Sequence, residues 1–182
     1  MIHDYAFVDD VLSWKECKYL RNYGHRKVKE SLIEGAQVHV SRKSKNCFIS
    51  SNVKDKKVKE IMTKVVRCYF DISRGFFKFP IEIIEPIQYA EYDEGMYYQL
   101  HADSGFTIDR DISASVVLSA RDKYEGGELK FGHLKSPTEE KLGRIIVFPS
   151  AIQHEVLPVK KGRRSSLVLW GRRGIADDKK AD

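Results

Sequence analysis

Two histidines and one aspartate are the residues in this sequence best suited to chemistry. His101 and Asp103 form a His-X-Asp triplet, and His154 lies further along the chain. On a β-strand, side chains two positions apart project from the same face, so this imidazole and this carboxylate point toward one site. His154 opens a second predicted strand. If the two strands face each other, two imidazole nitrogens and one carboxylate oxygen can occupy one face of a metal ion.

This ligand set is typical of non-haem Fe(II) centres that activate O₂, because it leaves adjacent coordination positions open. A structural zinc site, by contrast, is closed by four protein ligands. Taken alone, a His-X-Asp triplet also arises by chance, and an accidental or structural occurrence stays an alternative. The remaining histidines have no usable partner spacing and are expected to be surface or packing residues: His3, His25, His39 and His133.

An arginine that could bind a carboxylate follows the second histidine. Arg164 stands ten residues after His154, beyond a turn at Gly162. We expect a hairpin here to return Arg164 to the strand beside His154, where its guanidinium could hold a carboxylate in a bidentate pair. Ser166 would lie on the same face and could donate a further hydrogen bond. The alternative is that Arg163 and Arg164 are exposed turn cations.

The elements that must position these residues change character along the chain. The first half predicts a helix from about Ser13 to Tyr23, begun by a capping box between Ser13 and Glu16. A second helix is predicted from Lys54, with an apolar stripe of Val58, Ile61, Met62, Val65, Val66 and Tyr69. The second half predicts short strands separated by turn residues, at Ile81–Glu91, Tyr97–His101, Ile112–Ser119, Gly127–Phe131, Arg144–Phe148, Glu155–Val159 and Ser165–Gly171.

Strands at this spacing, with helices gathered at the N-terminal side, predict a mainly β fold with some α structure. The architecture expected is a double-stranded β-helix, or jelly roll, with the N-terminal helices packed on one sheet. Residues 1–175 are expected to form a single domain, and residues 176–182 a flexible tail.

Composition narrows the function classes. The chain has 182 residues, of which 42% are hydrophobic and 32% charged, and its three cysteines form no CxxC pair, which argues against a disulfide scaffold. No apolar run approaches the roughly 18 residues needed to span a bilayer, and the first residues lack a signal-peptide pattern, so a cytoplasmic location is expected. The net charge of +6 is uneven, since residues 1–81 carry 17 basic and 9 acidic groups while residues 82–140 carry 5 and 13. The basic half is most simply a solvated face, and nucleic acid is not favoured as a partner.

From about residue 85 to residue 172 the sequence resembles the Fe(II)/2-oxoglutarate-dependent dioxygenases, and within them the prolyl 4-hydroxylase-like group. The matching segments are EPIQYAEYDEGMYYQLHAD at 85–103, RDIS at 110–113, YEGGEL at 124–129 and HEVLPVKKGRR at 154–164, followed by Trp170. The segment FVDDVLS at 7–13 is also similar to the opening of that family.

The resemblance implies roles for the cofactor residues. His101, Asp103 and His154 would bind the catalytic Fe(II). Arg164 would hold the distal carboxylate of 2-oxoglutarate, although many prolyl 4-hydroxylases have a lysine at this position, and Tyr92 would bind the same carboxylate. Tyr92 is otherwise an ordinary strand aromatic with a polar tip.

The resemblance also implies a peptide groove. Its residues would be Tyr98, Arg110, Trp170 and Glu85, while Arg172 stands where some members have histidine. Three of the four groove residues have a plainer alternative: Tyr98 as a strand aromatic, Trp170 as core packing and Glu85 as a charge at a strand edge.

The implied activity is hydroxylation of a C–H bond, most directly in a prolyl residue of a peptide or protein. It would use Fe(II), 2-oxoglutarate and O₂, with ascorbate as reductant. Because imidazoles ligate metal only when neutral, activity should fall at acidic pH. One alternative keeps this chemistry for a free amino acid, another small molecule or an alkylated nucleic-acid base. Another is a non-catalytic jelly-roll binding module, which would not need both histidines, the aspartate and Arg164 together.

Overall fold

The computed structural model describes residues 4–30, 41–105 and 108–174. Its larger sheet has eight strands and is antiparallel throughout. The strand order is β1 (Ala6–Val8), β11 (Ile145–Pro149), β8 (Ile112–Val117), β14 (Arg164–Arg172), β6 (Ile87–Tyr92), β4 (Lys45–Ile49) and β2 (Lys29–Glu30), with β5 (Ile83–Ile84) also paired to β14.

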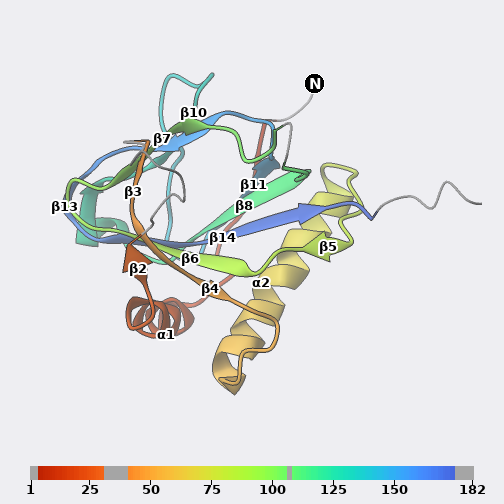
Figure 1. The fold of residues 1–182 in the computed structure, drawn as a ribbon, viewed down its shortest axis with the longest axis horizontal. Helices are drawn as coiled ribbons and strands as arrows, with labels where there is room; N and C mark the ends of the chain where they lie inside the picture. Colours follow the sequence, from red (N-terminus) through yellow and green to blue (C-terminus); the bar gives the residue numbers. More distant parts are fainter. Residues whose placement is uncertain (1–3, 31–40, 106–107, 175–182) are drawn as a thin grey trace, which may run out of the picture.

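A four-stranded antiparallel sheet lies over the larger sheet (Figure 1). Its order is β10 (Leu129–Phe131), β12 (His154–Val156), β7 (Tyr97–His101) and β3 (Arg42–Lys43). A separate pair joins β9 (Tyr124–Gly126), which follows a 3₁₀ turn at Arg121–Lys123, to β13 (Val159–Gly162). The molecule is therefore mainly β, with two facing sheets in the jelly-roll arrangement that the strand spacing predicted.

Both α-helices lie on the outer face of the larger sheet (Figure 1). Helix α1 (Trp14–His25) begins with the expected capping box, in which the Ser13 hydroxyl accepts from the Glu16 backbone and the Glu16 carboxylate accepts from the Ser13 N–H. Helix α2 (Lys56–Gly75) is capped by the Asp55 carboxylate, which accepts from the Val58 N–H.

One hydrophobic core joins the helices to the sheet. It contains the buried faces of both helices, including Cys17 and Leu20 from α1 and Ile61 and Val65 from α2, together with Leu167 of β14. The α2 stripe read from the sequence is buried as expected, apart from the half-buried Val66. Among the described residues, neither helix combines the length and apolar character needed to cross a bilayer.

Alternation along β14 separates this core from the interior of the jelly roll. Leu167 and Leu169 join the core under the helices, whereas Arg164, Ser166 and Trp170 line a cavity on the other face. Strand β14 thus packs one face against the helices and presents candidate site residues on the other.

Two of the predicted strands each run across a break between two observed strands. The predicted strand Ile81–Glu91 is interrupted between β5 and β6 at Glu85 and Pro86, and the predicted strand Glu155–Val159 is interrupted between β12 and β13 at Leu157 and Pro158. In both places a proline, which has no N–H to donate to a ladder, stands at the break. The predicted tail at 176–182 lies outside the described residues, and the single domain remains a prediction.

Candidate metal and cosubstrate site

The two histidines and the aspartate of the sequence motif come together in the four-stranded sheet. His101 ends β7 and His154 begins β12, and the two are directly paired neighbours in the ladder. The two strands therefore lie side by side in one sheet and do not need to face each other to bring the three side chains together. Asp103 Oδ1 is 3.6 Å from His101 Nε2, and Asp103 Oδ2 is 3.5 Å from His154 Nε2. One ligand atom from each residue lies within 4.8 Å of the other two.

Backbone carbonyls fix both imidazoles in the form that a metal needs. His101 Nδ1 is 2.8 Å from the carbonyl oxygen of Gln99, and His154 Nδ1 is 2.9 Å from that of Ile152. A carbonyl oxygen only accepts, so in each neutral ring the proton is on Nδ1 and the lone pair is on Nε2. Both Nε2 atoms approach Asp103. Such support of the non-ligating nitrogen is usual for histidines that bind metals.

Asp103 is held from behind by two serines. The Ser113 hydroxyl, on β8, donates to Asp103 Oδ2 at 2.7 Å and is 2.8 Å from the Ser150 hydroxyl. The backbone N–H of Asp103 also donates to the Ser150 carbonyl at 2.9 Å. The carboxylate is thus oriented by the larger sheet although it follows a strand of the smaller one.

The charge state of the three side chains suits a divalent cation. Burial opposes ionisation of Asp103, but contact with His101, the charge of His154 and the Ser113 hydrogen bond outweigh it and lower the pKa of Asp103 to about 2. Burial lowers the pKa of His154, against the opposing effect of Asp103. At neutral pH the site therefore presents a carboxylate and a neutral His154 imidazole.

The chemistry of the donors fits a bound Fe(II). Two nitrogens and one oxygen converge at the rim of a cavity, and the described residues provide no fourth histidine, cysteine or acidic ligand at this cluster. The Trp170 Nε1–H is buried, and it has no hydrogen bond of normal geometry among the described residues, although it lies close enough to Asp103 to help lower that pKa. An unpaired buried donor beside the ligands is consistent with a site built for a further polar group.

A narrow cavity of about 40 Å³ lies between the two sheets at this point. Eight of the ten residues singled out from the sequence line it: His101, Asp103, His154, Tyr92, Tyr98, Arg164, Ser166 and Trp170. Arg42 and Gln88 also line it, and the Arg42 guanidinium donates to Gln88 Oε1 at 2.8 Å and lies over the Tyr98 ring. Sequence reasoning did not single out these two residues.

Arg164 reaches the cavity from the opposite side. It begins β14 in the larger sheet, whereas His154 lies in the smaller one, so the expected hairpin that would place them side by side was wrong. The chain leaves the smaller sheet after β12, pairs briefly with β9 as β13, and then enters the larger sheet. Arg164 is nevertheless buried, at 1% exposed, while Arg163 is 46% exposed and bonds to Asp93. Only Arg163 is an exposed turn cation.

The surroundings of Arg164 include a residue that sequence reasoning missed. Glu140, also fully buried, accepts from Arg164 Nη2 at 2.6 Å and from Nε at 3.2 Å. Arg164 Nη1 donates to the Ser166 hydroxyl at 3.2 Å, and the guanidinium carbon is 5.7 Å from the centre of the Tyr92 ring. Glu140 comes from a loop without any recognisable motif, so no local pattern could have identified it.

Two of the four residues expected in a peptide groove line the cavity, and the other two lie outside its lining. Tyr98 stacks on the His101 ring, with centroids 3.6 Å apart. Arg110 lies over the Trp170 ring at 4.0 Å and donates twice to Glu85, each time at 2.7 Å. Tyr98 and Trp170 line the cavity, and the Arg110–Glu85 pair lies outside its lining.

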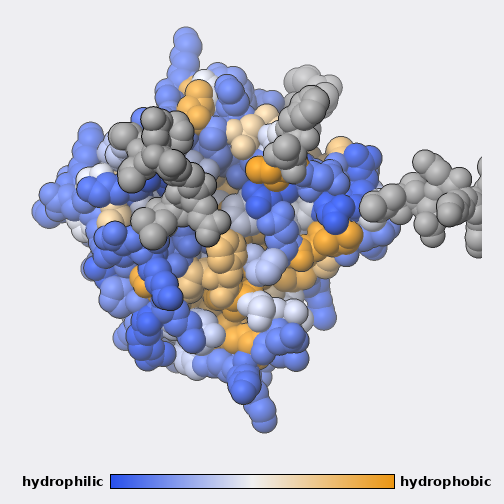
Figure 2. Space-filling model, in the orientation of Figure 1, coloured by the Kyte–Doolittle hydropathy of each residue, from blue (hydrophilic) through white to orange (hydrophobic). Residues whose placement is uncertain are grey.

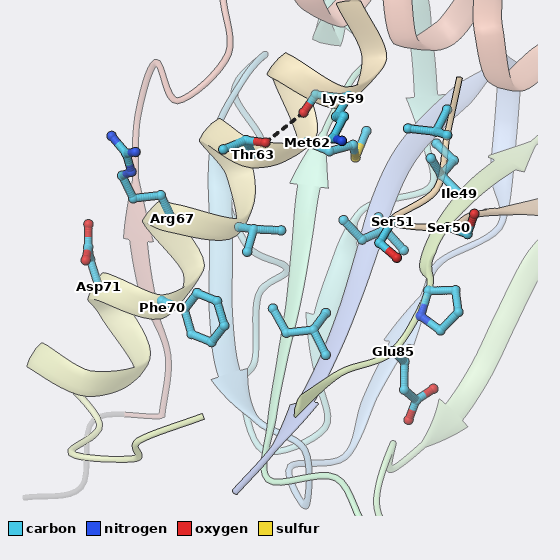
Figure 3. Close-up of a pocket in the computed structure, with 15 residues that line it drawn as sticks. Ile49, Ser50, Ser51, Lys59, Met62, Thr63, Arg67, Phe70, Asp71 and Glu85 are labelled. Carbon is cyan, nitrogen blue, oxygen red and sulfur yellow. Dashed lines mark hydrogen bonds between the residues drawn. The ribbon is translucent and has the colours of Figure 1, made fainter. Parts of the chain in front are cut away.

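A larger groove of about 600 Å³ lies elsewhere, between α2 and the start of β6 (Figure 3). Met62 and Phe70 of α2 line it, with Ile49 and Pro86 on the sheet side. Of the ten candidate site residues, Glu85 alone lines this groove. Figure 2 shows apolar side chains gathered beside α2 on this face, surrounded by hydrophilic residues. None of the candidate metal or cosubstrate residues lines this groove.

Comparison with known proteins gives the context of the cavity. Residues 87–172 match the family model described as the 2OG-Fe(II) oxygenase superfamily. A PKHD-type hydroxylase of Synechococcus sp. (strain JA-2-3B'a(2-13)) is 36% identical over 104 residues, which are 53% of this chain and 46% of that protein. The chain spans about half the length of the curated relatives it matches.

Solved structures share the fold over nearly the whole chain. The viral collagen prolyl hydroxylase from Paramecium Bursaria Chlorella virus-1, in its 2OG complex, has a TM-score of 0.71 and 26% identity, covering 94% of this chain and 97% of that one. A prolyl hydroxylase from Trichoplax adhaerens, in complex with a hypoxia inducible factor peptide fragment, has a TM-score of 0.75 and 18% identity, covering 93% and 83%.

Proposed function

We propose that this chain, which belongs to the 2OG-Fe(II) oxygenase superfamily, is an Fe(II)- and 2-oxoglutarate-dependent dioxygenase that hydroxylates a prolyl residue in a peptide or protein. The observation that carries the proposal is the meeting of two ligand sets in one cavity. The smaller sheet contributes His101 and His154 with the adjoining Asp103, and the larger sheet contributes Arg164.

The three ligand residues would hold Fe(II) through two Nε2 atoms and one carboxylate. Fe(II) with 2-oxoglutarate and O₂ supplies the oxidation, in which the cosubstrate loses CO₂ to become succinate and one oxygen atom enters a substrate C–H bond. The protein keeps His154 neutral by burial and Asp103 ionised by its hydrogen bonds. It also fixes both rings through the Gln99 and Ile152 carbonyls.

Arg164 would bind the far carboxylate of 2-oxoglutarate. Its guanidinium is buried, charged and supported by Ser166, and it lies on the opposite wall of the cavity from the histidines. A molecule with a carboxylate at each end can therefore reach both walls. Because the cavity is narrow, we expect cosubstrate entry to move the half-buried Arg42 and Tyr98 rather than the fully buried Arg164.

The prolyl assignment rests on the relatives and on the aromatic lining. Tyr98 and Trp170 offer apolar faces beside the ligand cluster, and the clamped Arg110 stacks on Trp170. Aromatic faces of this kind can hold a pyrrolidine ring and exclude water from the reacting carbon. The similar proteins include prolyl hydroxylases, one of them in complex with a peptide.

Two accompanying properties belong to the same proposal. Ascorbate would serve as the reductant that keeps the metal ferrous. A cytoplasmic location is in line with Cys17, Cys47 and Cys68 being free thiols in the structure.

The test is a substrate panel supplied to the Fe(II)-loaded protein with 2-oxoglutarate and ascorbate. The panel contains proline-containing peptides, free proline and an alkylated single-stranded oligonucleotide. We expect succinate together with the mass gain of one oxygen atom on a peptide. A gain confined to free proline or to the oligonucleotide would reject the prolyl-peptide assignment. The absence of both succinate and 2-oxoglutarate binding would reject the enzyme assignment.

A further inference from the structure

The cosubstrate arginine already has a carboxylate partner within the protein. A guanidinium has five N–H groups. Glu140 accepts two of those on Arg164, from Nε and Nη2, and Ser166 accepts one from Nη1. One N–H on Nη1 and one on Nη2 are left without a partner among the described residues. Arg164 can thus still receive a carboxylate, but its charge is already balanced by Glu140.

Glu140 is held in place independently of Arg164. The Tyr124 hydroxyl donates to its Oε2 at 2.6 Å, and the Leu129 backbone N–H donates to its Oε1 at 3.4 Å. The neighbouring Thr138 bonds twice to the Leu129 carbonyl, which ties the loop to β10. The carboxylate is therefore a fixed, buried partner of Arg164, which lines the cavity, and not a surface acid that has folded inward.

The charge balance has a chemical consequence. Burial works against ionisation of Glu140, but the charge and hydrogen bonds of Arg164 and the donors Tyr124 and Leu129 lower its pKa. At neutral pH the buried pair is therefore neutral as a unit. An unpaired buried guanidinium attracts any small anion, whereas a neutral pair offers mainly directed N–H groups.

We propose that Glu140 is a specificity-determining residue of the cosubstrate site: by cancelling the charge of Arg164, it restricts binding to a carboxylate whose other end is anchored at the metal ligands. The inference rests on the proposed function, because it assumes that Arg164 receives 2-oxoglutarate. In this arrangement free anions such as phosphate do not compete for the site, and the affinity for 2-oxoglutarate is lower than an unbalanced arginine would give.

The test compares Glu140→Gln with Glu139→Gln in calorimetric titrations of the anaerobic Fe(II)-loaded protein. Glu139 is the adjacent residue, its side chain is 70% exposed, and it bonds to Arg144 outside the cavity, so it is a matched control. With 2-oxoglutarate as the probe, we expect the Kd of Glu140→Gln to fall by about fivefold or more. We also expect inorganic phosphate to compete with 2-oxoglutarate in Glu140→Gln and not in the wild type or the control.

The outcomes separate the two proposals. If the wild type and Glu139→Gln bind no 2-oxoglutarate, the proposed function fails. If they bind it and Glu140→Gln binds it equally or more weakly, or gains no competition by phosphate, only the inference about Glu140 is overturned. The Glu140→Gln variant could fail to fold in the absence of ligand. In that case saturating 2-oxoglutarate should restore its cooperative thermal unfolding, because the ligand supplies a carboxylate to Arg164. A variant that stays unfolded with the ligand would overturn the inference.

Discussion

The orientation and charge of the three candidate metal ligands depend on the groups behind them. The Asp103 carboxylate accepts a hydrogen bond from Ser113, and its pKa of about 2 keeps it ionised far below neutral pH. A divalent ion would therefore meet a site that has few protons to release.

The first prediction concerns metal retention. Replacing Asp103 with alanine removes the only anionic ligand among the three, so the purified variant should retain no stoichiometric Fe(II) after dialysis. Ser113→Ala keeps all three ligands but loses the hydrogen bond that orients Asp103, together with the contact to the Ser150 hydroxyl, so its metal affinity should fall by about tenfold. Metal analysis of the dialysed proteins measures both effects. Wild-type metal content in Asp103→Ala would refute the ligand assignment.

The second prediction separates the adjacent arginines. Arg164→Ala should weaken 2-oxoglutarate binding by more than about 1.5 kcal/mol, because it removes a charge-assisted pair in a buried site. Arg163→Ala should leave the affinity unchanged, because Arg163 bonds to Asp93 at the surface. Titration of each Fe(II)-loaded variant provides the comparison. Equal losses in the two variants would show that the buried arginine has no special role.

The third prediction is a pH dependence of stability. The folded-state pKa of Glu140 lies below its ordinary value, because Arg164 and the hydrogen bonds to the carboxylate outweigh burial. The pairing with Arg164 therefore stabilises the fold fully above the unfolded-state pKa of about 4.3, and this stabilisation is lost as the pH falls through the folded-state pKa. Glu140→Gln removes this contribution and should lower the free energy of unfolding by about 3 kcal/mol at neutral pH. Denaturant titrations should show this gap closing as the pH falls below about 4. A gap that stays constant as the pH falls well below about 4 would argue against an ionised Glu140.

At the scale of elements, the contact between α1 and the sheet depends on a residue without a side chain. A Cβ at Gly24 would lie within 2.6 Å of three atoms of the Tyr89 ring on β6. Gly24→Ala should therefore destabilise the protein by about 1–3 kcal/mol, although alanine is the better helix former. A Cβ at Gly75, at the end of α2, would meet no atom of the described residues within 4 Å, so Gly75→Ala should be neutral or slightly stabilising. Thermal unfolding of both variants distinguishes overpacking from helix propensity, and equal stability of the two would contradict the tight contact.

The helices were the elements most readable from the sequence, because their signals are local. The capping box at Ser13 and the apolar stripe from Val58 to Tyr69 depend only on spacing within one helix. Pairing between strands depends on partners far along the chain, and the wrong prediction was of this kind: a hairpin that would place Arg164 beside His154. The sequence around Gly162 resembles a hairpin turn, yet Pro158 interrupts the ladder and the chain crosses to the other sheet.

The candidate site shows the same division. His101, Asp103 and His154 could be identified because two of them share a strand-spaced triplet and all three have chemically distinctive side chains. Glu140 could not be identified, because it reaches Arg164 from a loop 24 residues earlier with no pattern of its own. Its role depends on the packing of β9, β10 and β14 around one buried pair.

At the scale of the whole molecule, the uneven charge gains a more specific meaning. The acidic segment from residue 82 to residue 140 contains Asp103 and Glu140, and the basic end of the chain contains Arg164. Folding brings Asp103 and Arg164 to the walls of one cavity between the two sheets, where the candidate metal ligands face the proposed cosubstrate cation, and it pairs Glu140 with Arg164. The binding of a dicarboxylate at both walls would join the sheets through the ligand.

The most direct test of the central claim is succinate formation by the purified protein supplied with Fe(II), 2-oxoglutarate and O₂ and a proline-containing peptide. The wild type should form succinate in proportion to hydroxylated peptide, only when the metal and O₂ are both present. Asp103→Ala should form none above the metal-free blank. Equal succinate formation by the two proteins, or none by the wild type under any of these conditions, would contradict the account.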